Sequence, residues 1–81
     1  MAYVTIDGEK YEKELIDLAN EFTSGDSGGR VSKEEVEKLF ESAMDGRGIT
    51  ETEMKTLKYI RANFNFTDAS GKLFDDKMAG L

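Results

Sequence analysis

Oxygen-bearing side chains recur through residues 24–35, which read SGDSGGRVSKEE. Calcium ions in proteins take about six to eight oxygen ligands from carboxylates, hydroxyls and backbone carbonyls. A segment with this spacing of oxygens is therefore a candidate metal site. The candidate ligands are side-chain or backbone oxygens of six residues: Ser24, Asp26, Gly28, Arg30, Ser32 and Glu35.

The segment resembles the calcium loop of an EF-hand in a degenerate form. The resemblance covers roughly residues 10–44, about 40% of the chain, and implies a helix–loop–helix unit with a weak calcium site. A glycine stands at the sharp turn, an apolar residue follows, and a Glu enters the next helix. The matching residues are Asp26, Gly29, Val31, Ser32 and Glu35.

The same segment departs from that family in its supply of charge. Ser24 stands where a first carboxylate normally anchors the ion, and Gly28 has no side chain to offer. Asp26 and Glu35 bring the negative charges, and Arg30 places a positive charge beside them. The sequence thus leaves two alternatives, a weakly held Ca²⁺ or no cofactor.

Helix capping explains part of the same pattern without a metal. Ser32 followed three residues later by Glu35 is a capping box, in which each side chain bonds the other residue's backbone N–H. The pattern repeats 18 residues later at Thr50 and Glu53. Capping accounts for both helix starts, whereas calcium binding accounts for one.

Apolar spacing predicts an all-α fold, a small EF-hand-like bundle of about four short helices preceded by a short extended N-terminal arm. The helices are expected at about residues 9–22, 33–44, 51–63 and 68–78, with an arm over residues 1–8 and one acidic domain over residues 1–81. A hairpin turning at Asp7-Gly8 is the alternative for the start, disfavoured because an isolated hairpin is marginally stable. The predicted core residues are Leu15, Leu18, Phe22, Val36, Leu39, Phe40, Leu57, Ile60, Phe64 and Leu73.

A second resemblance rests on two stretches, GRVSKEEVEKL at residues 29–39 and DGRGITETEMKTLKYIRANFNFTDAS at residues 45–70. Together they are similar to a small bacterial domain with a Gly-Asp-Gly-Arg-like loop. That resemblance implies a fold unit and carries no activity with it.

Composition argues against several function classes. The chain of 81 residues has no Cys and no His, which removes the usual nucleophile–base pairs and predicts a protein that is not an enzyme. Its net charge of −6 disfavours binding to nucleic acid, and no apolar run approaches the ~20 residues of a membrane span. The lack of Cys and of a secretory signal predicts a cytoplasmic location.

Charge is unevenly distributed along the chain. Residues 1–45 hold twelve Asp or Glu and five Lys or Arg, a net of −7, whereas residues 46–81 hold five and six, a net of +1. The leading hypothesis is a non-enzymatic module that binds an unidentified protein partner. The residues expected to contact it are Glu12, Glu14 and Asp17 on the first helix and Lys55, Lys58, Tyr59 and Arg61 on the third.

Two other functions stay open at this point. One is a weak calcium-responsive EF-hand-like domain that uses residues 24–35. The other is a small acidic inhibitor of a nucleic-acid-binding enzyme, whose carboxylates would stand where phosphates normally sit. The sequence does not predict an oligomeric state.

Overall fold

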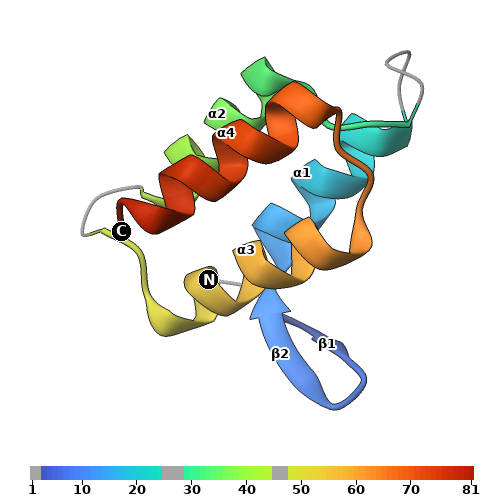
Figure 1. Ribbon diagram of the computed structural model, residues 1–81. Coiled ribbons are helices and arrows are strands. Elements are labelled where there is room, and N and C mark those ends of the chain that lie inside the picture. Colours follow the sequence, from blue (N-terminus) through green and yellow to red (C-terminus); the bar gives the residue numbers. More distant parts are fainter. Residues whose placement is uncertain (1–2, 25–28, 45–47) are drawn as a thin grey trace.

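The computed structural model describes residues 3–24, 29–44 and 48–81. Two short strands form a hairpin, β1 (Tyr3–Ile6) and β2 (Glu9–Glu12), and four helices follow. The helices are α1 (Lys13–Ser24), α2 (Lys33–Ala43), α3 (Glu51–Asn63) and α4 (Asp68–Ala79). In Figure 1, α2 and α4 lie side by side and run in the same direction, and the hairpin projects next to α3. The fold is therefore predominantly helical.

The prediction of a purely all-α chain with an extended arm is wrong at the N-terminus. Residues 3–12 form an antiparallel hairpin in which Ile6 pairs with Glu9. Asp7 and Gly8 have φ values of 51° and 82°, the two positive values that a tight hairpin turn requires. Because Glu9–Glu12 pairs with β1, α1 begins at Lys13 instead of about residue 9.

Tertiary contacts stabilise this hairpin, which would be marginal on its own. Val4, Ile6 and Tyr11 pack against the helical core, and the rings of Tyr11 and Tyr59 lie 4.6 Å apart. These contacts join the hairpin to α3, and they come from residues far away in the sequence.

Both predicted capping boxes are confirmed. At the start of α2, the Ser32 hydroxyl accepts from the Glu35 N–H, and the Glu35 carboxylate accepts from the Ser32 N–H. Thr50 and Glu53 make the same two bonds at the start of α3. Thr67 caps α4 by accepting from the Ser70 N–H. Caps of this kind each contribute about 1 kcal/mol to helix stability.

The entrances of α2 and α4 are joined by a short parallel bridge between Val31 and Phe66. The Val31 N–H donates to the Asn65 carbonyl at 2.8 Å, and the Thr67 N–H donates to the Val31 carbonyl at 3.4 Å. The buried Ser70 hydroxyl also donates to the Val31 carbonyl, at 2.6 Å. These bonds fix the two helix starts beside each other.

The core lies between the four helices and differs from the predicted one in its detail. Leu15, Phe22, Val36, Leu39, Phe40, Leu57 and Ile60 are buried as expected. Phe74, and not Leu73, is the buried large residue of α4, because Ser70 and Gly71 face the same way and set the helix register. Leu18, Phe64 and Leu73 are half-buried at the edge of the core.

Candidate functional site

The residues predicted to ligate calcium are only partly within the described structure. Asp26 and Gly28 lie outside the described residues. Ser24 is the last residue of α1, where its hydroxyl donates to the Glu21 carbonyl at 3.0 Å, and Arg30 is exposed just before α2.

Ser32 and Glu35 both take part in the capping box. The Glu35 Oε1 atom lies 2.9 Å from the Ser32 nitrogen, and the Ser32 hydroxyl lies 3.3 Å from the Glu35 nitrogen. Across residues 3–24, 29–44 and 48–81, no three acidic side chains are grouped so that they could hold a metal ion.

The three acidic residues proposed to face a partner differ in their surroundings. Glu14 is exposed on α1. Asp17 is exposed as well, but its carboxylate pairs with the Lys13 ammonium at 2.6 Å one helical turn away. Glu12 is 7% exposed at the joint between β2 and α1, so it contributes little to an acidic surface.

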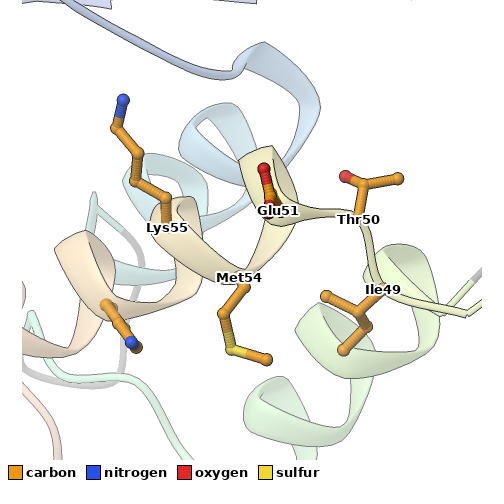
Figure 2. A pocket seen from close by; sticks show the side chains of 6 residues that line it. Ile49, Thr50, Glu51, Met54 and Lys55 are labelled. Atoms are coloured by element: carbon orange, nitrogen blue, oxygen red, sulfur yellow. The ribbon is translucent and has the colours of Figure 1, made fainter.

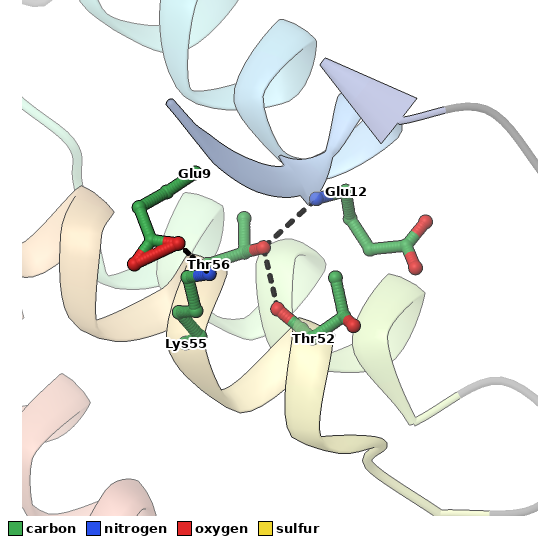
Figure 3. A network of polar contacts seen from close by, with 5 residues as sticks. All are labelled: Glu9, Glu12, Thr52, Lys55 and Thr56. Carbon is green, nitrogen blue, oxygen red and sulfur yellow. Dashed lines mark hydrogen bonds and ion pairs between the residues drawn. The ribbon is translucent and has the colours of Figure 1, made fainter. Parts of the chain in front are cut away.

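The joint around Glu12 is a small polar network (Figure 3). The Glu12 backbone N–H donates to the Thr56 hydroxyl at 2.9 Å, and that hydroxyl donates to the Thr52 carbonyl at 2.6 Å. Beside it, the Lys55 ammonium pairs with the Glu9 carboxylate at 3.1 Å. The network fastens the hairpin to α3.

Burial raises the pKa of the Glu12 carboxyl above its ordinary value of 4.5, and the negative charge of Glu53 adds to the effect. The positive N-terminus lowers the pKa in part, and Glu14 contributes a smaller increase. A raised carboxyl pKa means that the folded state binds the proton more tightly than the unfolded chain does. The ionised side chain therefore costs stability near neutral pH.

The basic stripe predicted along α3 is largely neutralised within the chain. Lys55 pairs with Glu9, and the Arg61 guanidinium contacts both carboxylate oxygens of Asp75, at 3.0 and 3.3 Å. Lys58, between them, is exposed and forms no ion pair with any residue that the structure describes.

The Arg61 guanidinium packs closely on α4 because residue 71 of that helix is a glycine. A Cβ atom added at Gly71 would lie 2.8 Å from an Arg61 guanidinium nitrogen. The guanidinium also lies 5.1 Å from the centre of the Phe66 ring. Arg61 therefore links α3 to α4 and is less available to a partner than the sequence suggested.

Tyr59 packs within the chain. Its half-buried ring lies between Tyr11, at 4.6 Å, and Phe64, at 6.5 Å between ring centres. These contacts place Tyr59 at the edge of the core, so its ring is less available to a partner than the sequence analysis expected.

Two shallow surface hollows meet at Lys58. The first, of about 380 Å³, is lined mainly by apolar atoms, and Figure 2 shows Ile49 and Met54 close together on one side of it. The second, of about 240 Å³, lies between α3 and α4. The first is lined by Ile49, Thr50, Glu51, Met54, Lys55 and Lys58, and the second by Lys58, Arg61, Ala62, Phe74, Asp75 and Met78.

Sequence reasoning did not find these hollows, although it named three of their lysines and arginines. Ile49 precedes the Thr50 cap and Met54 follows it by four residues, a pattern that predicts a hydrophobic staple. A staple packs two apolar side chains together at the start of a helix and indicates no binding function. In the structure both are half-buried and leave apolar surface open to solvent. Nothing in the local sequence indicates that the two side chains of a hydrophobic staple will stay only half-buried.

A third hollow, of about 510 Å³, lies between α1 and α2 and is more polar. Its lining residues are Glu14, Leu18, Lys38, Glu41 and Ser42. Mixed charges and one half-buried leucine give it less apolar surface than the hollow beside Ile49.

Comparison with protein-family models, with curated proteins and with solved structures gives no match for this chain. None of the described helices combines the length and the apolar character needed to cross a membrane.

The buried carboxyl leads to a prediction about stability and pH. Replacing Glu12 by Gln removes a charge that the folded state disfavours, so we expect Glu12→Gln to raise the thermal midpoint near pH 7. The gain should disappear at about pH 3.5, below the ordinary pKa of 4.5, where the wild-type carboxyl is protonated in both states. Thermal unfolding followed by circular dichroism at both pH values measures it.

Glu21→Gln, at an exposed position of α1, is the matched control and should change the midpoint little at either pH. A lower midpoint for Glu12→Gln near pH 7 would contradict this account of the joint.

Proposed function

We propose that this protein is a non-enzymatic interaction module that binds a partner protein along α3. The observation that carries the proposal is the exposed ammonium of Lys58, at the point where two hollows meet. Protein interfaces typically combine apolar anchors with a few charged groups that fix orientation. The surface beside Lys58 offers both.

The partner that fits this surface is an amphipathic helix with apolar anchors and one carboxylate. Ile49, Met54 and Met78 provide apolar contacts, and methionine side chains adapt easily to different partners. Lys58 provides the complementary charge for the carboxylate. A strongly acidic partner is disfavoured, because the chain itself carries a net charge of −6.

The rest of the described surface supports binding over catalysis. The chain has no Cys or His, and the buried carboxyl of Glu12 lies in the hairpin joint and lines neither of the hollows beside Lys58. A perturbed carboxyl outside a cleft is a structural feature more often than a catalytic one.

We keep a second proposal, a weak calcium-responsive EF-hand-like unit formed by α1, α2 and the residues between them. Two observations favour it. Gly29 has a φ of 77°, as a glycine at a sharp turn requires, and Glu35 uses one carboxylate oxygen in its capping box while the other bonds no described residue. With two carboxylates available, the affinity would be low.

Charge reversal at Lys58 tests the first proposal. The probes are amphipathic peptides of about 14 residues, roughly four helical turns, with apolar residues on one face and Glu, Gln or Lys beside them. The Glu peptide should bind tightest and shift the amide signals of Ile49, Met54 and Lys58 in NMR spectra. Lys58→Glu should lower the affinity for the Glu peptide by about tenfold, since a desolvated charge contact is worth more than ~1 kcal/mol. The same variant should bind the Lys peptide more tightly than the wild type does.

Lys72→Glu, a reversal at an exposed position of α4, is the control and should leave all three affinities nearly unchanged. Equal binding of the three peptides, or signal shifts confined to α1 and α2, would contradict the proposed surface.

A calcium titration tests the second proposal. Calcium at millimolar concentration should shift the amide signals of Gly29 and Val31, and Asp26→Ala should abolish those shifts. Asp76→Ala, an exposed carboxylate on α4, should not affect them. Unmoved signals at Gly29 and Val31 would exclude the calcium proposal and leave the interaction surface untouched.

A further inference from the structure

The outer edge of β1 presents backbone groups that the hairpin does not use. Residues facing each other in an antiparallel pair alternate between bonded and non-bonded pairs. The two-residue turn at Asp7-Gly8 closes with Ile6 and Glu9 as a bonded pair. Val4 and Tyr11 are then the next bonded pair, and Tyr3 and Thr5 belong to non-bonded pairs.

An independent contact supports this alternation. Glu12, the partner of Tyr3, turns its N–H away from β1 and donates it to the Thr56 hydroxyl of α3. By the same rule, the N–H and C=O groups of Tyr3 and Thr5 point away from β2. Within the described part of the chain no residue hydrogen-bonds them.

The two edges of the hairpin thus differ. Helix α3 lies against β2, through the Glu12–Thr56 bond, the Glu9–Lys55 ion pair and the packing of Tyr11 on Tyr59. Of the two strands, β2 is the one that packs on α3, and β1 lies beside it (Figure 1). Tyr3 is 51% exposed, and Thr5 is exposed as well.

Protection against strand pairing is weak along β1. Exposed edge strands are commonly blocked by a charged residue, a proline or a bulge. The sequence of β1 is Tyr-Val-Thr-Ile, and its four residues pair with β2 without an interruption. Shortness is the one protective feature it has.

We propose that the outer edge of β1 binds an extended segment of a partner protein by strand addition. Tyr3 and Thr5 each contribute one donor and one acceptor, so four backbone hydrogen bonds can form. Val4 and Ile6 pack toward the core, so the partner residue beside Val4 is β-branched or aromatic. The partner segment is therefore extended and rich in β-branched or aromatic residues.

A second copy of the chain fits this edge less well than a different protein. Each copy carries a net charge of −6, so two copies repel each other. A four-residue edge also buries far less than the roughly 1,200 Å² of a stable interface. A different protein can also contact this chain at a second surface. That contact holds its extended segment near β1 at a high effective concentration, which compensates for the small area of the edge.

The test uses a peptide with the residues Tyr-Val-Thr-Ile between two pairs of lysines, and a control peptide with Pro in place of Thr. The first peptide should slow hydrogen exchange at the Tyr3 and Thr5 amides by about tenfold, while the control peptide should have no effect. Amide exchange followed by NMR measures the effect of both peptides at the Tyr3 and Thr5 amides themselves, in the unaltered protein.

Thr5→Pro should abolish the slowed exchange at Tyr3, because it removes an outward N–H that the hairpin does not need. Unchanged signals of Val4 and Ile6 would show that the hairpin persists in this variant. Asp68→Pro, at the first position of α4 where proline is tolerated, should respond to the peptide like the wild type.

Absence of slowed exchange at millimolar peptide, or the same slowing in Thr5→Pro, would overturn the proposal. Slowed exchange that appears without peptide and grows with protein concentration would assign the edge to a second copy and would also overturn it. The β1 edge does not include Lys58, so an experiment can contradict one of the two proposed contact surfaces without contradicting the other.

Discussion

The backbone bridge between Val31 and Phe66 is the contact on which the arrangement of the helices depends. It joins the residue before the Ser32 cap to the residue before the Thr67 cap, so α2 and α4 begin side by side. The buried Ser70 hydroxyl donates a third hydrogen bond to the same carbonyl that Thr67 contacts. With both entrances held, the Phe40 and Phe74 rings meet edge to face at 4.9 Å and close the core. Helix α1 packs on α2 and on α3, which carries the hairpin.

This arrangement also decides which charges face outward. Because α3 lies between the hairpin and α4, Lys55 reaches Glu9 on one side and Arg61 reaches Asp75 on the other. The α3 surface therefore carries less positive charge than its sequence suggests, and Lys58 stands out between two apolar hollows. The hairpin, held by α3 through β2, leaves β1 as an open edge. Both proposed contact surfaces thus follow from how α3 is placed.

Sequence reasoning succeeded where the decisive interaction is local. The Ser32 and Thr50 caps act within four residues, so their pattern predicts the starts of α2 and α3. It failed where the decisive partner is distant: the hairpin is held by Thr56, 44 residues from Glu12. Likewise, the bond from Ser70 to Val31 spans 39 residues and helps bring Phe74, in place of Leu73, into the core. Of the residues expected to contact a partner, Glu14, Asp17 and Lys58 are exposed, as that role requires. The ion pairs of Lys55 and Arg61 depend on residues of other elements and could not be predicted from the sequence of α3.

The most direct test of the central bridge is hydrogen exchange at the Val31 amide, whose N–H donates to the Asn65 carbonyl. If the bridge organises the fold, this amide should exchange only through global unfolding, with the same opening free energy as Phe40 and Leu57 in the helical core. Exchange at Val31 as fast as at neighbouring Gly29 would show that the two helix entrances separate freely, and would contradict the account.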